Sequence, residues 1–236
     1  MDLAESEPLI RVRGLHYQYP DGTIALTGVD FDLFPGETVA LLGANGSGKT
    51  TFVLHLNGLL QGVGDLTIDG LVVNDETVGA IRQKIGLVFQ DSDDQLFMPS
   101  VLEDVLFGPL NLGMEKDQAL RQAESALEAT GVLSLKDRAP HHLSAGQKKR
   151  AAIAGVLAME PSILILDEPT TYLDPPGRQE LIRLLKELPQ AKILVTHDLD
   201  FAASLASRAV FFESGRITDC GPVAGVIGRR QWRCLP

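Results

Sequence analysis

The chain has 236 residues, enough to bury one substantial core in a single domain or a domain with a subdomain. Its 21 basic and 31 acidic side chains give a net charge of −10, which argues against nucleic-acid binding because that needs a basic face. Cys220 and Cys234 lack the spacing of metal ligands and are expected to be reduced thiols in a cytosolic protein. The acidic start (MDLAESEPLI) predicts no secretion signal, and no run approaches the roughly 18 apolar residues of a membrane span. Work at a membrane would therefore require docking onto another chain.

A glycine-rich stretch follows the first predicted strands. Alternating residues predict antiparallel strands at 9–19 and 24–34, and the apolar run 38–42 predicts a buried strand. Residues 43–50 (GANGSGKT) then match G-x-x-x-x-G-K-[ST], the phosphate-binding P-loop, and 51–60 predicts a helix. At such a turn, glycines let backbone N–H groups face an anion, and the helix N-terminus adds partial positive charge.

The P-loop assigns roles to two side chains. Lys49 is expected to reach the β- and γ-phosphates of a nucleotide, and the Thr50 hydroxyl to bind Mg²⁺. The alternative is a glycine-rich turn that binds nothing, against which the flanking strand and helix argue.

The middle of the chain is predicted to change from strands to helices. Residues 65–74 predict a hairpin, 77–83 a short helix, and 85–89 an apolar strand that ends at Gln90. The polar stretch 91–95 (DSDDQ) cannot continue a buried strand.

Residues 100–158 are predicted to be helical. Ser100 with Glu103, and Ser144 with Gln147, fit the capping box that opens a helix. Ser144 would therefore cap a helix whose N-terminus is presented to a ligand or, alternatively, a helix with only a structural cap.

Two adjacent carboxylates end the next strand. The apolar run 163–166 predicts a buried strand, and Asp167 and Glu168 lie at its tip, where they are costly unless they meet a metal or a phosphate site. With a P-loop upstream, the pattern indicates a Walker-B pair in which Asp167 supports Mg²⁺ and Glu168 orients or deprotonates water. The alternative is a pair of solvated acids at a strand end.

The last part of the chain repeats the pattern of helix and strand. Asp174 caps a predicted helix that runs to about Leu188, and 191–196 predicts a strand that ends at His197. A strand-turn-strand is predicted over 210–217.

In this order the elements resemble an ABC-type ATPase subunit over roughly residues 9–220. LSAGQ (143–147) resembles the ABC signature LSGGQ and departs from it at Ala145, where only a backbone N–H is needed. Gln90 matches the Q-loop glutamine, ILILDE (163–168) matches Walker B, and His197 matches the H-loop histidine.

Two family positions match less closely. TYLD (171–174) occupies the D-loop, usually SALD, so only Leu173 and Asp174 match well. Tyr19 is the expected A-loop aromatic that stacks on adenine, and Tyr17 is the alternative.

The resemblance implies an α/β fold: a P-loop NTPase (ABC ATPase) core with an N-terminal antiparallel β subdomain and a helical signature subdomain. Residues 9–90 and 161–220 would form the nucleotide-binding core and 91–160 the helical subdomain. Residues 221–236 would be a short tail, a solvated end with a basic cluster around Trp232.

The resemblance also implies an ATP hydrolase that uses Mg²⁺. Glu168, His197 and Gln90 would be catalytic, with Glu168 activating water, and Thr50, Gln90 and Asp167 would hold the metal. The expected nucleotide-binding residues, some of them reaching the ATP of a second chain, are Tyr19, Gly43, Ala44, Asn45, Gly46, Ser47, Gly48, Lys49, Thr50, Thr51, Ser144, Ala145, Gly146, Gln147 and Asp174.

Finer features resemble one branch of the family, the cobalt/nickel-type energy-coupling-factor importers. They are YPDGTIAL (19–26), VFQDSDDQLF (88–97), VLEDVLFGPLNLG (101–113) and LSAGQKKRAAIAGVLAMEP (143–161). This implies a peripheral subunit at the cytoplasmic face of the cell membrane. Its partners would be a second ABC ATPase (a copy or a paralogue), a membrane T component and a substrate-binding S component. Charge at Asp93 and Asp94 would meet the membrane partner.

Three alternatives compete with this interpretation. The first is the ATPase of an energy-coupling-factor vitamin importer. The second is a soluble ABC ATPase, although this chain lacks the coiled coils of repair-type members and has one cassette. The third is a P-loop kinase, which would leave LSAGQ unexplained. The pair His141-His142 is expected to be a solvated loop without further ligands.

Overall fold

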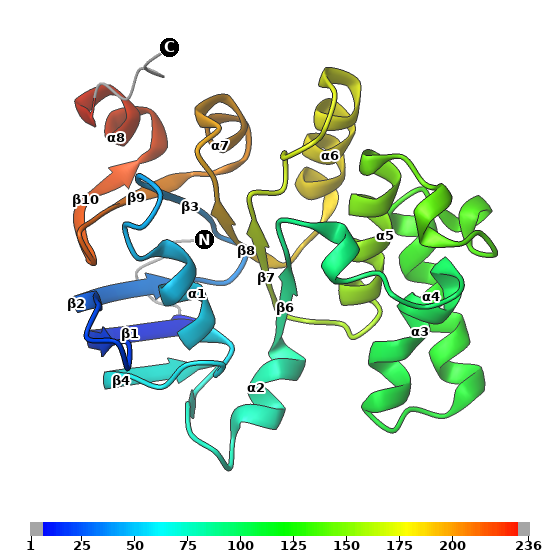
Figure 1. Ribbon diagram of the computed structural model, residues 1–236, viewed down its shortest axis with the longest axis horizontal. Helices are drawn as coiled ribbons and strands as arrows, with labels where there is room; N and C mark the ends of the chain where they lie inside the picture. The colour runs from blue at the N-terminus through cyan, green and yellow to red at the C-terminus, as the bar shows by residue number, and fades with distance from the viewer. Residues whose placement is uncertain (1–6, 231–236) are drawn as a thin grey trace.

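The described part of the chain contains two β-sheets, helices beside them and a separate block of helices (Figure 1). The computed structural model describes residues 7–230, and within them the first sheet has the order β2-β1-β4-β5 and is antiparallel. Its strands are β1 (Ile10–Gln18), β2 (Ile24–Leu33), β4 (Val63–Ile68) and β5 (Leu71–Val72). This is the N-terminal β subdomain that the sequence predicts.

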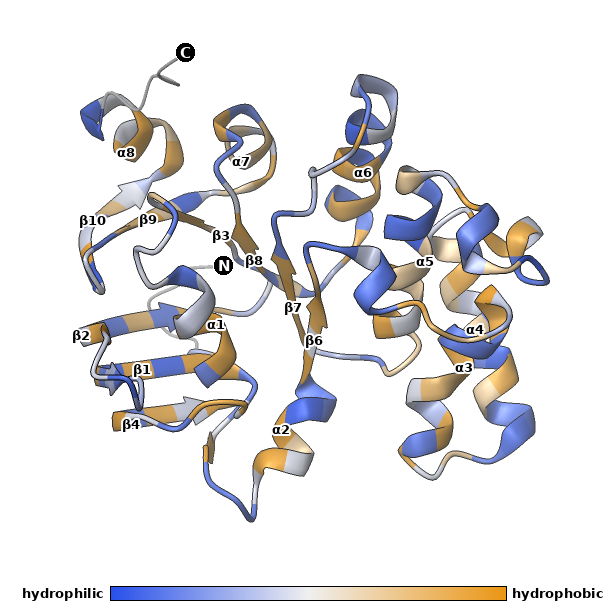
Figure 2. Ribbon diagram, viewed as in Figure 1, coloured by the Kyte–Doolittle hydropathy of each residue, from blue (hydrophilic) through white to orange (hydrophobic). Residues whose placement is uncertain are grey.

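The second sheet has the order β10-β9-β3-β8-β7-β6 within the described residues. Its strands are β3 (Thr38–Leu42), β6 (Ile85–Val88), β7 (Ile163–Asp167), β8 (Ala191–Val195), β9 (Arg208–Glu213) and β10 (Arg216–Pro222). All neighbours pair in parallel except β10, which is antiparallel to β9. Figure 2 shows β6, β7 and β8 as apolar strands, as expected for strands covered on both faces.

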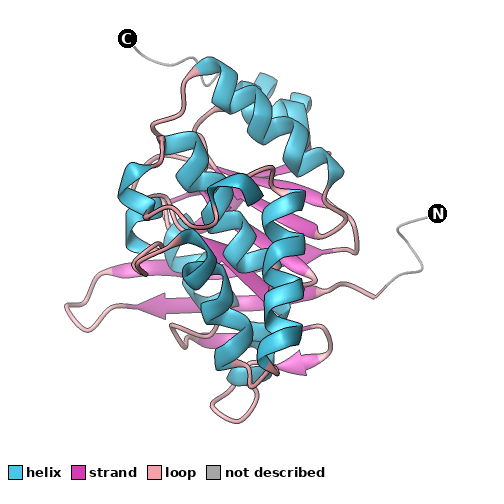
Figure 3. Ribbon diagram, turned by 90° about the vertical axis from the view of Figure 1, so that its right-hand side faces the viewer, coloured by secondary structure: helices cyan, strands magenta, loops and turns pink. Residues whose placement is uncertain are grey.

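The helices separate into two groups. Near the sheets lie α1 (Lys49–Leu56), α2 (Val78–Lys84), α6 (Pro175–Glu187), α7 (Leu199–Leu205) and α8 (Val223–Arg230), and the separate block contains α3 (Val101–Asn111), α4 (Lys116–Ala129) and α5 (Ala145–Leu157). Figure 3 shows this block in front of the strands. The block packs on the parallel sheet through a core that includes Val105, Ile153 and Leu164, all of which are buried.

A second core joins the two sheets beneath the P-loop helix. Phe52 of α1 is fully buried and contacts the rings of Phe31 in β2 and Phe212 in β9. Because a buried phenylalanine contributes a large apolar surface, this contact fixes α1 against both sheets. The position of α1 in turn fixes the P-loop.

Some local details differ from the sequence predictions. Helix α1 begins at Lys49 and ends at Leu56, earlier than predicted, and Gly58 with φ +68° follows its end. Residues 223–230 of the predicted tail form α8. The helix is stabilised by Val226, which is fully buried in a cluster with Ala202 and Ala206 at α7. Residues 231–236, with Trp232 and Cys234, lie outside the described residues.

The predicted caps are present. Ser144 Oγ accepts from Gln147 N at 3.3 Å and Gln147 Oε1 accepts from Ser144 N at 3.0 Å, a complete capping box. Ser100 Oγ accepts from Glu103 N at 3.3 Å at the start of α3.

Helix α5 packs closely on the sheet at Gly86 of β6. A Cβ at this position would lie 2.0 Å from Val156 Cγ1 of α5 and 3.1 Å from Leu164 Cδ2. Val156 is buried and has a stiff β-branched side chain, so the strand and the helix would have to move apart to make room.

Gly86→Ala should therefore lower the free energy of unfolding by about 1–3 kcal/mol, the usual cost of overpacking a core, in urea unfolding of the full chain. Gly79→Ala is the matched control: Gly79 is an exposed residue of α2 with open space around an added Cβ. That change should be stabilising by roughly 0.5–1 kcal/mol. Wild-type stability of Gly86→Ala would contradict the close packing of α5 on β6.

Candidate functional site

The P-loop joins β3 to α1, and its backbone excludes side chains. Gly48 has φ +108°, and a Cβ there would lie 2.7 Å from Ala25 O. At Gly43, with φ +144°, a Cβ would lie 2.3 Å from Phe212 O. Both positions thus require glycine, and they leave the N–H groups at the start of α1 free of Cβ atoms. This is the geometry that binds a phosphate at a helix N-terminus.

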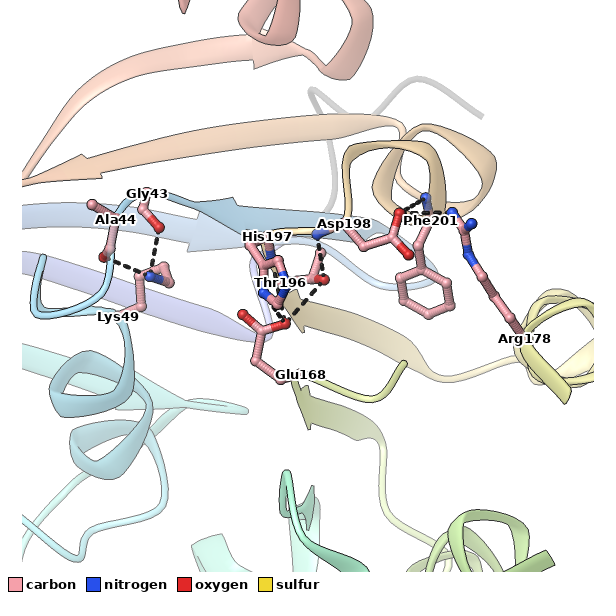
Figure 4. A network of polar contacts seen from close by, with 9 residues as sticks. All are labelled: Gly43, Ala44, Lys49, Glu168, Arg178, Thr196, His197, Asp198 and Phe201. Atoms are coloured by element: carbon pink, nitrogen blue, oxygen red, sulfur yellow. Dashed lines mark hydrogen bonds and ion pairs between the residues drawn. The ribbon is translucent and has the colours of Figure 1, made fainter. Parts of the chain in front are cut away.

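Lys49 folds back onto the P-loop. Its ammonium group donates to Gly43 O at 2.7 Å and to Ala44 O at 2.9 Å, as Figure 4 shows. The side chain is buried, and desolvation lowers the pKa of Lys49, although the negative charges of Glu168 and Asp167 oppose the shift. Within residues 7–230 its hydrogen-bond partners are these two carbonyls, which the ammonium group can exchange for phosphate oxygens.

A cavity of about 430 Å³ opens in front of the P-loop. Its lining combines the turn after β1, the P-loop, and the ends of β6 and β7, namely Tyr19, Thr23, Ile24, Ala25, Asn45, Gly46, Gly48, Lys49, Thr50, Thr51, Gln90, Asp167, Glu168 and Val195. Seven of the fifteen residues predicted to bind the nucleotide therefore line one cavity, together with Gln90, Asp167 and Glu168. Gly43, Ala44 and Ser47 belong to the same loop but do not line this cavity.

The structure distinguishes the two tyrosines that the sequence left open. Tyr19 lines the cavity, and its hydroxyl lies 3.0 Å from Thr51 Oγ1. Tyr17 packs edge-on against Tyr19 and His55, with ring centroids at 5.0 and 4.7 Å. Tyr19 is thus the aromatic ring available to a bound base, and Tyr17 supports it.

Sequence reasoning missed Ile24, which also lines the cavity. Its side chain is 66% exposed, at the start of β2. The available sequence signal is an isoleucine directly after the predicted turn that follows Tyr19, a position from which it could offer an apolar contact to the same base.

The Walker-B carboxylates lie at the end of β7. Burial raises the pKa of Asp167, and the charge of Glu168 adds to the shift, while Lys49 and Lys149 oppose it. Asp167, Thr50 and Gln90 line one cavity and offer a carboxylate, a hydroxyl and an amide oxygen. These are ligands that suit Mg²⁺, and a cation there would relieve the repulsion between the half-buried carboxylate of Asp167 and the buried one of Glu168.

Glu168 is held in an unusual conformation by the end of β8. Its φ is +40°, a left-handed value that is rare for a non-glycine residue and costs about 1–3 kcal/mol. Its Oε2 lies 2.9 Å from His197 Nδ1 and 3.3 Å from Thr196 Oγ1 (Figure 4). The strained backbone thus brings one carboxylate oxygen to the histidine while Glu168 still lines the cavity. The sequence did not indicate the role of Thr196.

The remaining predicted residues lie away from this cavity. Ser144 is exposed at the start of α5, and α5 is on the far side of β6 and β7 from α1 in Figure 1. A Cβ on Gly146 would lie 3.9 Å from Leu173 Cδ2, so the signature lies beside the predicted D-loop. Asp174 caps α6 by accepting from Gly177 N at 2.9 Å. The cavity of the same chain is not lined by the signature residues or the α6 cap, which are Ser144, Ala145, Gly146, Gln147 and Asp174.

Comparison with known proteins identifies the family. The model described as ABC transporter matches residues 26–171, which is more than half of the chain. The chain belongs to the ABC transporter family of ATP-binding proteins. As an ABC ATPase it is an ATP hydrolase with the P-loop ABC core. In residues 7–230, no helix combines the length and apolar character needed to cross a membrane.

Named relatives and solved structures agree with this family. The energy-coupling factor transporter ATP-binding protein EcfA of Carboxydothermus hydrogenoformans is 49% identical, over 88% of this chain and 78% of the relative. EcfA of Methanothermobacter thermautotrophicus is also 49% identical, over 89% and 69% of the two chains.

The solved structure of cbiO1 from Clostridium perfringens, part of the transporter complex cbiONQ, matches with a TM-score of 0.87 and 40% identity, covering 95% of this chain and 92% of that one. The dimeric structure of MJ0796, a bacterial ABC transporter cassette, matches with a TM-score of 0.80 and 28% identity, over 91% and 98%.

Lys49→Ala should weaken ATP binding by at least about 10²-fold, since a charge-assisted hydrogen bond contributes roughly 1.5–3 kcal/mol and the ammonium group can make more than one. Titration calorimetry on the full chain measures this affinity. Lys186→Ala, a change of an exposed lysine on α6, is the control and should bind ATP like the wild type. Unchanged affinity of Lys49→Ala would contradict the assignment of the P-loop.

Proposed function

We propose that this ABC ATPase powers import through an energy-coupling-factor transporter, with cobalt or nickel ions as the cargo. The observation that carries the proposal is its likeness to two EcfA proteins and to cbiO1 over nearly the whole chain. A cobalt or nickel cargo is supported by the resemblance of the segments around Gln90 and Ser144 to that branch.

An apolar groove on the helical block supports docking of a membrane partner. It has a volume of about 400 Å³ and lies over the segment that follows Gln90. Phe97 and Phe107 line it with ring centroids 5.2 Å apart, and they are 62% and 42% exposed. Exposed rings in a groove favour an apolar helix as occupant, and a helix of the membrane T component fits this requirement.

The acidic residues near this groove would orient that helix. Asp94 lines the groove, and Asp93 is exposed beside it and paired with Lys148 of α5. A basic residue on the T component would find these carboxylates at the rim, where charge sets orientation and association rate more than affinity.

We infer the following division of labour in hydrolysis. Tyr19 stacks on adenine, and Lys49 with the P-loop N–H groups binds the β- and γ-phosphates. Glu168 accepts a proton from the attacking water, and His197 binds the γ-phosphate and keeps Glu168 in place. Thr50, Gln90 and Asp167 would hold Mg²⁺, which neutralises charge on the β- and γ-phosphates when bound.

One chain forms only half of this site. The exposed N-terminus of α5, capped by Ser144, is suited to bind a γ-phosphate but lies away from the P-loop of its own chain. A head-to-tail arrangement with a second ABC ATPase, a copy or a paralogue, places this helix on the partner's ATP. Asp174 would communicate between the two sites. The protein would then sit at the membrane as a peripheral subunit on its cytoplasmic face.

Glu168→Gln should reduce the turnover of ATP by about 10²–10⁴-fold, the usual contribution of a general base, while ATP binding persists because Lys49 and the P-loop are intact. Phosphate release measures the turnover. Glu187→Gln, which changes an exposed residue at the end of α6, is the control and should keep the wild-type rate. Hydrolysis by Glu168→Gln at the wild-type rate would show that the base lies elsewhere.

Purification of the tagged chain from its native membranes tests the proposed partners. We expect a polytopic membrane subunit and a small, very apolar second subunit to co-purify, and the double change Asp93→Lys and Asp94→Lys to reduce their recovery. Binding of Co²⁺ or Ni²⁺ to the second subunit would support the cargo, and binding of a vitamin instead would contradict it. Recovery with soluble partners alone would overturn the transport function and leave the ATPase assignment intact.

A further inference from the structure

A buried lysine of α5, the helix that begins in the signature and is called the signature helix below, donates hydrogen bonds to the backbone around Gln90. Lys149 lies in the second turn of α5 and is 2% exposed. Its ammonium group donates to Phe89 O at 3.0 Å and to Gln90 O at 2.8 Å. The sequence pattern indicates no role for Lys149, and the proposed chemistry does not use it.

Further contacts tie the same segment to the same helix. Gln95 Oε1 accepts from Phe89 N at 3.3 Å, and Gln95 Nε2 donates to Ala152 O of α5 at 3.4 Å. Lys148 adds an ion pair with Asp93. The backbone from Phe89 to Gln95 is therefore held against α5 at several points, and the loop after β6 runs to α5 in Figure 1.

Burying Lys149 in this place is costly. Desolvation lowers the pKa of Lys149 to about 8, against the attraction of Asp91 and Asp167. Among the residues the structure describes, its hydrogen-bond partners are two neutral carbonyls rather than a carboxylate. A hydrophobic side chain would pack in such a position without this penalty, so packing alone does not account for a lysine here.

The two carbonyls belong to residues at the point where β6 ends and the chain leaves the sheet. Gln90, which Lys149 fixes by its carbonyl, lines the same cavity as Thr50 and Asp167. Ser144 lies at the N-terminus of the same helix as Lys149. A single helix therefore connects the glutamine of one nucleotide site to the signature that faces another chain.

We propose that Lys149 is a positioning residue that makes Gln90 move together with the signature helix. Movement of α5 when Ser144 meets the ATP of a second chain then carries Gln90 toward or away from the metal site of its own chain. This inference rests on the proposed roles of Gln90 and Ser144, and it adds the physical connection between them.

A double-mutant cycle in the full chain tests this role by measuring kcat and KM for ATP. Lys149→Met keeps the length of the side chain and removes its donors. We expect kcat to fall roughly tenfold with a nearly unchanged KM, because a small misplacement of a metal-site residue is enough to slow the reaction. In a Gln90→Ala background, the same change should cost less than about twofold, since the residue it positions is absent.

Lys186→Met is the matched control, a loss of an exposed ammonium group on α6 that should leave kcat unchanged in both backgrounds. Lys149→Gln keeps a polar side chain that is too short to reach both carbonyls. Lys149→Gln should lower kcat by a similar factor in the wild-type background and have little effect in the Gln90→Ala background. It replaces Lys149→Met if that variant does not fold.

A residue with only a structural role would lower the midpoint of unfolding and reduce kcat equally in both backgrounds. That outcome, or a folded Lys149 variant with wild-type kcat, would overturn the inference. Failure of Glu168→Gln to lose activity would contradict the proposed site instead, so the two results are distinguishable.

Discussion

The balance of charge around Lys49 is the constraint on which the rest of the site depends. Its ammonium group lies among P-loop carbonyls and near the carboxylates of Asp167 and Glu168. Burial disfavours the charged forms of Lys49 and Asp167, and the attraction between their opposite charges opposes this effect. The parallel sheet creates this arrangement, because β3, β7 and β8 all end at the same edge. In the proposed site, a nucleoside triphosphate with its cation would complete the balance by supplying negative charge to Lys49 and positive charge to Asp167.

The same constraint explains why one chain is incomplete. Lys49, Gln90 and Glu168 line one cavity, whereas the capped N-terminus of α5 lies away from it. The strained backbone of Glu168 and its contact with His197 hold the carboxylate that we propose as the general base. In the proposed dimer, closure by a second chain would supply the positive end of a helix, and hydrolysis would remove the phosphate that holds the chains together.

Local patterns in the sequence predicted much of the fold and the centre of the site. The P-loop, the apolar strands and the Ser144 capping box depend on neighbouring residues, so their elements appear close to the expected positions. Helix α8 was missed because its glycines weaken the helical pattern and its stability comes from packing of Val226.

Contacts between distant segments could not be predicted in this way. Which of Tyr17 and Tyr19 faces the cavity depends on how β1 packs against α1. The hydrogen bond from Lys149 to the carbonyl of Gln90 joins residues about 60 positions apart. Such details arise from tertiary packing.

A complementation assay tests the central claim, a nucleotide site shared by two chains, most directly. Folded Lys49→Ala and Ser144→Arg chains are assayed for ATP hydrolysis separately and as an equal mixture. Each alone should be inactive, and the mixture should regain hydrolysis because a mixed dimer contains one intact site. Wild-type activity of Ser144→Arg alone, or an inactive mixture whose chains cross-link as dimers, would contradict the account.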